Sequence, residues 1–377
     1  MPFSASSPPS AAFATWVDDV LMPMWRDRGV DAHTGFAFEA LDRQRRPVLS
    51  GFHRTMVAAR LGYFYARCAA RQPHDARWRE LAATQIGLLD GVFRDARHGG
   101  WHYSIKPDGT PHDAGKDLYT HAFAIFAFAE YAGLTGDDLW LARADEALSC
   151  LDKLAAPQGG WWARMNSDFQ TGIDAPAQNP LMHCFEAVSH LHRHSAAPSH
   201  LARLKEIAHV MQQQFAVPER DRILELPVGT PNNRVEPGHQ FEWFSLAAAS
   251  PLAEPLGVAP GGLVYRMLQR ALNEGLTEDG LVPLACTPDY APKDPVHRIW
   301  TQLEFVRAAH VAHRLHGDAS FAAARDRALA ALQGHFLQPD GWFEVIHGSK
   351  VLRAEQPGSS PYHFMTCVDD LYPAQTR

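Results

Sequence analysis

Two kinds of helical pattern alternate along the chain. Residues 121–129 are apolar on every face of a helix, which is typical of a helix enclosed by other helices. Residues 138–154 instead place apolar side chains at helical spacing among charged ones, as in a helix with one face in water. The pairing recurs in three more stretches: 55–69 with 75–93, 181–192 with 201–215, and 300–316 with 321–336. The pattern therefore predicts helix pairs packed in two layers.

A short glycine-containing motif separates successive helix pairs. Its copies are Gly35-Phe36, Gly99-Gly100-Trp101, Gly159-Gly160-Trp161, Gly280-Leu281 and Gly341-Trp342. The spacing is roughly 60 residues, which suits two helices and a short extended connection. One interval is double, and it leaves room for a degenerate copy near Arg222-Ile223-Leu224.

This repeat predicts an all-α fold, an (α/α)6 barrel of six inner and six outer helices with short β-hairpins or loops on one rim. The last unit is followed by only one short helix from about Tyr362, so we expect residues 11–26 to supply the missing outer helix and close the ring. No stretch rich in Gly or Pro is long enough to be a domain linker. We therefore predict a single domain over residues 1–377.

Composition and charge narrow the class of protein. The formal net charge of -7 argues against a nucleic-acid groove, which requires a basic face. The five cysteines are scattered and include no CxxC pair, which is typical of a reducing cytoplasm. No signal-peptide pattern or membrane-spanning run is present. The sequence also lacks a GxGxxG motif, a P-loop and an HExxH motif, so we expect no nucleotide cofactor and no metal.

Polar side chains gather where each inner helix is predicted to begin. Because all six beginnings open on one rim, these side chains should line one polar bowl with acid/base histidines. Nearby tryptophans would suit a sugar, whose C–H faces stack on indoles. In chain order the polar residues are Arg54; Lys116, Asp117, Tyr119 and His121; Asn179, His183 and Glu186; Arg234, His239 and Glu242; Arg298, Trp300, Gln302 and Glu304; and Tyr362 and His363.

Several ordered motifs resemble the N-acylglucosamine 2-epimerase superfamily over nearly the whole chain. They are Gly51-Phe52-His53-Arg54, Asn179-Pro180-Leu181-Met182-His183, Pro237-Gly238-His239-Gln240-Phe241-Glu242-Trp243 and Tyr362-His363. Within the superfamily, residues 116–123 and 298–304 are most similar to D-mannose isomerases and related sulfosugar isomerases. Disaccharide 2-epimerases tend to have Gln in place of His121 and paired Trp in place of Ile299-Trp300. The resemblance thus implies an (α/α)6-barrel aldose–ketose isomerase acting on D-mannose and D-fructose, with D-lyxose and D-xylulose as further candidate substrates.

The resemblance also implies a metal-independent mechanism through an enediolate. His363 would take the C2 proton, His239 would act as acid/base for ring opening and proton delivery, and Glu242 would orient His239. Arg54 and His183 would polarise the carbonyl and stabilise the enediolate. The remaining residues, Asn179, Tyr119, His121, Trp300 and Gln302, would hold hydroxyls or stack on the sugar. The expected partner is a monosaccharide, and the expected state is a monomer or homodimer.

Three alternatives stay open at this point. A sugar 2-epimerase would use the same enediolate but return the proton to the other face of C2. A glycoside hydrolase would need two carboxylates across a scissile bond, for which Glu242 and Glu304 are the candidates. A binding protein on this fold would bind a sugar without turnover, because fold does not determine function.

Overall fold

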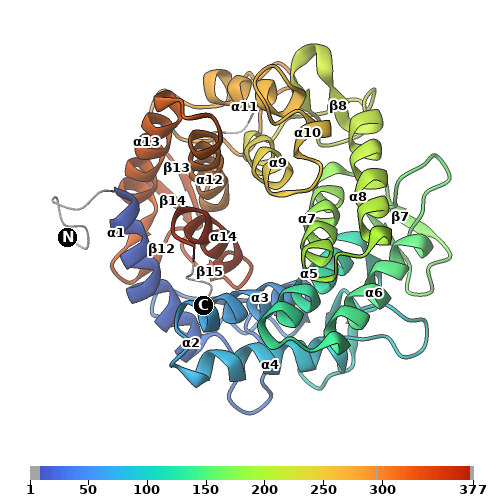
Figure 1. Cartoon of the computed structure of the whole chain (residues 1–377). Helices are drawn as coiled ribbons and strands as arrows, with labels where there is room; N and C mark the ends of the chain where they lie inside the picture. The colour runs from blue at the N-terminus through green and yellow to red at the C-terminus, as the bar shows by residue number, and fades with distance from the viewer. Residues whose placement is uncertain (1–8, 294, 374–377) are drawn as a thin grey trace.

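The computed structural model describes residues 9–293 and 295–373 and shows a closed double ring of helices (Figure 1). In the described residues the inner ring consists of α3 (Thr55–Arg71), α5 (Leu118–Thr135), α7 (Gln178–Ser195), α9 (Pro237–Ala249), α12 (Ile299–His316) and α14 (Pro361–Leu371). The outer ring consists of α4 (Ala76–Asp90), α6 (Asp138–Lys153), α8 (Pro198–Val210) with the π-helical turn η2 (Met211–Phe215), α11 (Leu263–Glu274), α13 (Ala319–His335), and an N-terminal segment. The predicted (α/α)6 barrel is confirmed.

The N-terminal segment closes the outer ring, as predicted. It consists of α1 (Pro9–Trp16), the π-helical turn η1 (Val17–Leu21) and α2 (Met22–Arg28), and α1 lies beside α13 (Figure 1). The Phe13 and Trp16 rings stack on Phe364 of α14. The Trp16 indole also donates to the Gln338 carbonyl, 2.8 Å away. These contacts pack the N-terminal segment against α14, the last inner helix.

The two helical patterns explain the two rings. The α5 helix is buried along almost its whole length, and Gly136 ends it in the left-handed conformation. Outer helices begin instead at aspartates whose side chains accept a backbone N–H of the first turn, as Asp75, Asp137 and Asp318 do. The sequence therefore sets both the burial and the ends of these helices.

Short antiparallel sheets form the rim at the N-terminal ends of the inner helices. In three units the strand before an inner helix pairs with the hairpin after its outer partner. These sheets are β2 (His53–Arg54) with β3 (Ser104–Ile105) and β4 (Pro111–Asp113); β5 (Lys116–Asp117) with β6 (Arg164–Met165) and β7 (Gly172–Asp174); and β10 (His297–Arg298) with β13 (Val345–His347) and β14 (Lys350–Arg353). Each sheet fixes the direction in which its inner helix starts.

The glycine motifs form tight turns close to this rim. Gly100 has a φ of 70°, and a Cβ there would lie 2.6 Å from Nε2 of His121, so the position needs glycine. The degenerate copy near residues 222–224 forms β9 (Arg222–Ile223), which pairs with β8 (Ala216–Val217). The remaining elements are β1 (Ala40–Leu41) with β15 (Gln356–Pro357), β8 (Ala216–Val217) with β9 (Arg222–Ile223), β11 (Leu337–Gln338) with β12 (Gly341–Trp342), η3 (Pro218–Arg220) and α10 (Ala253–Leu256).

The ends of the predicted 1–377 domain, residues 1–8 and 374–377, lie outside the described residues, and the single domain stays a prediction. Among the helices of the described residues, none combines the length and apolar character needed to cross a membrane.

Candidate active site

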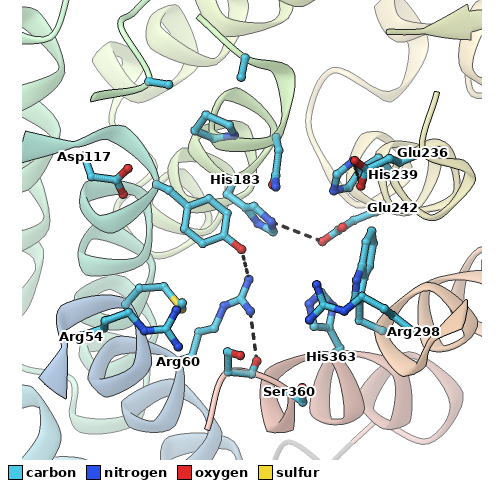
Figure 2. Close-up of a pocket in the computed structure, with 18 of the residues that line it drawn as sticks. Arg54, Arg60, Asp117, His183, Glu236, His239, Glu242, Arg298, Ser360 and His363 are labelled. Atoms are coloured by element: carbon cyan, nitrogen blue, oxygen red, sulfur yellow. Dashed lines mark hydrogen bonds and ion pairs between the residues drawn. The ribbon is translucent and has the colours of Figure 1, made fainter. Parts of the chain in front are cut away.

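A cavity of about 580 Å³ opens at the N-terminal ends of the inner helices. All six inner helices contribute side chains or adjoining residues to its wall, which confirms the common rim expected from the repeat. All the predicted site residues line it except His121 and Gln302. Its lining includes Arg54, Arg60, Asp117, Tyr119, Asn179, His183, Glu236, His239, Glu242, Arg298, Trp300, Ser360 and His363 (Figure 2).

His239, in the first turn of α9, is held as a cation. Its Nδ1 lies 2.9 Å from Oε1 of Glu225 and 3.5 Å from Oε2 of Glu236. Burial disfavours the charged ring, but these two carboxylates outweigh burial and raise the pKa of His239 to about 9. At neutral pH the ring therefore carries a proton that it can donate.

The partner predicted for His239 has to be corrected. Glu242 was expected to orient this ring, yet Glu225 makes the contact from the segment after β9. The prediction rested on the spacing of three residues between His239 and Glu242 within one helix. The spacing places both side chains at the cavity, but it does not point them at each other. Glu225 follows the degenerate repeat copy, and no motif in the sequence marks it.

His363, in the first turn of α14, has the opposite character. Its Nδ1 lies 2.7 Å from Oε1 of the fully buried Glu304 in α12. Burial, followed by the positive charge of Arg60, lowers the pKa of His363 well below its usual value. Burial raises the pKa of Glu304 to about 7. When Glu304 is ionised, Nδ1 donates to it and the Nε2 lone pair is left to accept a proton.

Glu242 is a buried carboxyl group on the cavity floor. Neither of its oxygens has a hydrogen-bond partner among the described residues, and Oε1 lies 4.0 Å from Nε2 of His183 (Figure 2). Burial, and then repulsion from Glu304 and Glu186, raise its pKa well above the usual range. These effects favour the protonated form of Glu242, which can donate a hydrogen bond to a bound molecule.

His183 of α7 is oriented from below by Glu186. Its Nδ1 lies 3.0 Å from Oε2 of Glu186, whose other oxygen accepts the Tyr362 hydroxyl. Burial works against the ionised carboxyl of Glu186, but the hydrogen bond from His183 and the electrostatic effects of His183, His190 and Arg307 together outweigh burial and lower the pKa of Glu186 to about 2. Burial also lowers the pKa of His183. The pair is thus a neutral imidazole on an ionised carboxylate, with Nε2 turned towards Glu242.

Arg60 of α3 is the cationic side chain that the sequence motifs missed. Arg54 lines the cavity, but its Nε and backbone N–H both bind the Glu39 carboxylate at 2.6 Å. The Arg60 guanidinium donates instead to the Ser359 carbonyl at 3.1 Å and to the Tyr119 hydroxyl at 2.5 Å. It also lies 4.1 Å from the centre of the Phe123 ring. A lone arginine within the apolar run 57–61 was the available signal.

Two predicted sugar-binding residues lie outside the cavity wall. The His121 ring is fully buried, with Nδ1 bonded to the Asp117 carbonyl and Nε2 accepting the Trp101 N–H, and burial lowers its pKa to about 4. The Gln302 amide clamps the backbone N–H and carbonyl of Val282 at 2.9 and 2.8 Å. Both side chains fasten rim segments to inner helices, and we do not propose them as sugar ligands.

Among the residues that the structure describes, three groups of buried side chains offer ligand atoms within 4.8 Å of one another. They are His183 with Glu186 and Glu242; His239 with Glu225 and Glu236; and His363 with Glu242 and Glu304. Imidazole and carboxylate ligands of this kind suit divalent first-row metals. The expected independence from metal therefore stays a prediction, and the assay described below includes a chelator.

The charge states predict a bell-shaped pH profile for kcat/KM. Activity should rise as pH increases through about 7, where Glu304 ionises and frees Nε2 of His363, and should fall through about 9, where His239 loses its proton. Initial rates at constant ionic strength would give both limbs, which belong to coupled pairs rather than to single groups. An activity that stays constant from pH 5 to pH 10 would contradict these assignments.

Comparison with known proteins places the chain in a family. The model of the family described as N-acylglucosamine 2-epimerase matches residues 35–367. The chain belongs to the N-acylglucosamine 2-epimerase family. The match covers both the residues of the cavity wall and the hairpins that hold them.

Named relatives of this chain include isomerases and epimerases. A mannose-6-phosphate isomerase of Rhizobium meliloti is 30% identical, over 95% of each chain. A D-mannose isomerase of Thermobifida fusca is 25% identical, over 82% of this chain and 80% of its own. The solved cellobiose 2-epimerase of Spirochaeta thermophila superposes with a TM-score of 0.86 at 20% identity, over 97% of this chain and 96% of its own, and shares the fold. The family and these relatives indicate a sugar isomerase or epimerase.

Proposed function

We propose that the protein is an aldose–ketose isomerase that interconverts D-mannose and D-fructose, with D-lyxose and D-xylulose as possible further substrates. The observation that supports this enediolate chemistry is a pair of histidines in different charge states, both close to one indole. The ring centres of His239 and His363 lie 4.9 and 5.7 Å from that of Trp300. One ring is a cation and the other is neutral. Both an isomerase and a two-base 2-epimerase start from one neutral base and one protonated acid, so this pair supports the enediolate chemistry that they share. The choice of an isomerase rests on the single Trp300, where disaccharide 2-epimerases tend to have paired Trp.

The mechanism follows from these charges. After ring opening, Nε2 of His363 removes the C2 proton, and the electrons of that C–H bond form the C1–C2 double bond while the C1 oxygen gains negative charge. His239 protonates that oxygen, and the hydroxyl on C2 then returns a proton to His239. His363 delivers its proton to C1, so a carbonyl forms at C2 and both histidines recover their first state. Arg60 stabilises the enediolate charge.

Other wall residues have binding roles in this proposal. Asn179 and Tyr119 reach the cavity and can bond sugar hydroxyls, and the Trp300 indole offers a face for stacking. The protonated carboxyl of Glu242, beside Nε2 of His183, can donate to a sugar oxygen during ring opening. The His121 ring lies outside the wall, so the difference from the Gln of disaccharide 2-epimerases at this position carries no weight, and the choice of an isomerase over a 2-epimerase rests on the single Trp300.

The deciding assay is incubation of the chelator-dialysed enzyme with D-mannose in D2O. We expect fructose that carries partial deuterium at C1, because His363 exchanges its proton with solvent before some turnovers. Chromatography and NMR would identify product and label. Glucose accumulating without fructose would favour the alternative, a 2-epimerase of the mannose/glucose, cellobiose or N-acylglucosamine type. Activity lost on dialysis and restored by one divalent ion would defeat the histidine mechanism.

D-Mannose 6-phosphate belongs in the same assay because one relative carries that name. Two arginines of the wall are already paired with buried carboxylates, Arg54 with Glu39 and Arg298 with Glu344. Their charge is therefore largely balanced before a phosphate arrives, whereas Arg60 bonds only neutral groups, so the comparison of the two sugars tests whether the wall accepts a phosphate.

The structure does not favour a glycoside hydrolase. Such an enzyme needs two carboxyl groups that flank the scissile bond. Of the two candidates, Glu242 lines the cavity, but Glu304 is fully buried behind His363 and is not part of the wall. No release of monosaccharide from oligosaccharides is therefore expected.

A further inference from the structure

His239 belongs to a closed chain of side-chain hydrogen bonds below the cavity wall. Its Nδ1 lies 2.9 Å from Oε1 of Glu225. The Gln178 amide nitrogen, in the first turn of α7, donates to both oxygens of Glu225 at 3.0 and 3.1 Å. The Trp243 indole donates to Oε1 of Gln178 at 2.8 Å and follows His239 by one turn of α9. The chain thus returns to the helix from which it started.

The indole fixes the direction of every bond in this chain. An indole N–H can only donate, so the Gln178 oxygen must face Trp243 and its amide nitrogen must face Glu225. Both oxygens of Glu225 then accept hydrogen bonds from this amide. A carboxylate that only accepts requires Nδ1 of His239 to donate, and Nε2 remains as the nitrogen available to the sugar. Gln178 and Trp243 are both fully buried, at 0% exposure.

We propose that Trp243 and Gln178 are positioning residues that set the orientation and charge of His239 through Glu225. Neither residue lines the cavity, so neither touches the substrate. The kinetic part of this inference rests on the proposed isomerase function, whereas the state of the ring can be measured without any substrate.

Other charged groups around His239 have to be taken into account. Glu236 at the start of α9 approaches Nδ1 at 3.5 Å and is itself bound by Arg234 at 2.9 Å. Glu242 in the same helix also favours the charged ring, while the His183 ring of α7 faces the same cavity. Glu225 differs from these groups because its hydrogen bonds lead away from the cavity, to α7 and back to α9.

The test compares two tryptophan variants of the full chain. Trp243→Phe keeps a packed ring but removes the donor, which frees the Gln178 amide to turn its oxygen towards Glu225. Trp101→Phe is the matched control, because that fully buried indole donates to the Leu89 carbonyl at 2.7 Å and lies outside this chain. Nitrogen NMR of labelled histidines at pH 7.5 reports how many nitrogens of His239 carry a proton. The His239→Asn variant would assign the signal.

We expect both nitrogens of His239 to be protonated in the wild type and in Trp101→Phe. In Trp243→Phe a second population with one unprotonated nitrogen should appear, and kcat should fall about tenfold with little change in KM, as one lost hydrogen bond to a charged pair suggests. Gln178→Met keeps a similar side-chain volume but removes the hydrogen bonds to Glu225 and from Trp243. It should show a larger second population and a larger fall in kcat, and it replaces Trp243→Phe if that variant does not fold.

Two results would separate the possible failures. If Trp243→Phe and Gln178→Met keep the wild-type histidine signals and the turnover of Trp101→Phe, the two residues do not position His239. If the wild type interconverts no aldose and ketose, the proposed function fails, but the NMR comparison still decides whether the chain of bonds sets the state of the ring.

Discussion

Replacing His363 or His239 by alanine should lower turnover by at least about 10²-fold, the lower range for losing a general acid or base. His363→Ala removes the neutral Nε2 that accepts the C2 proton. His239→Ala removes the cation that protonates the developing C1 oxygen. Because both act in the proton transfers themselves, kcat and kcat/KM should fall together. Initial rates with D-mannose, with fructose measured by chromatography, would give both constants.

His190→Ala is the matched control for this pair. His190 is also a buried histidine bonded to a buried carboxylate, with Nδ1 2.6 Å from Oε1 of Glu130, but it does not belong to the cavity wall. Its variant should lose stability in a melting experiment without a comparable loss of turnover. If either catalytic-site variant kept turnover close to wild type, that histidine would have no part in the mechanism.

The sequence contained enough information to predict the fold and the place of the site. Alternating apolar and amphipathic helices encode two rings, because each pattern states which faces meet water. The glycine motifs encode turns that only a residue tolerant of positive φ forms easily, as at Gly100. Since a repeat puts equivalent residues at equivalent places, the polar first turns had to share one rim.

Pairwise contacts inside the site could not be predicted in the same way. Spacing along one helix says which side chains share a face, but His239 finds its carboxylate 14 residues earlier in the chain, before the loop that leads into α9. The same limit applies to Arg54 and Arg60, which both lie near the start of α3. Glu39, from a segment before that helix, neutralises the first of them. Such partners come from segments outside the helix, and only the closed ring of helices brings these segments to the site.

The three buried glutamates of the site differ in their pKa values. Glu186, Glu242 and Glu304 lie in three neighbouring inner helices, and repulsion among them is one reason why Glu242 keeps its proton. The ionised Glu186 is compensated by bonds from His183 and Tyr362, and Glu304 by bonds to His363 and Arg307. The cavity therefore offers Glu242 as a neutral donor, His363 as a neutral base and His239 as a cation.

Arg60→Met should reduce kcat by about 10² to 10³-fold, the range for removing one donor that stabilises a developing oxyanion. Methionine keeps the packing against Phe123, but it removes the guanidinium beside Tyr119 and Ser359. The Arg60 charge also helps to lower the pKa of His363, so the acid limb of the pH profile should move to higher pH in the variant.

Arg54→Met is the comparison that decides between the two arginines. Because Glu39 already holds the Arg54 guanidinium at 2.6 Å, this variant should lose stability, through an unpaired buried carboxylate, more than it loses turnover. The acid limb of its pH profile should stay in place, since Arg54 is not among the charges that lower the pKa of His363. A larger loss of kcat in Arg54→Met than in Arg60→Met would return the enediolate-stabilising role to Arg54, as the sequence motif first suggested.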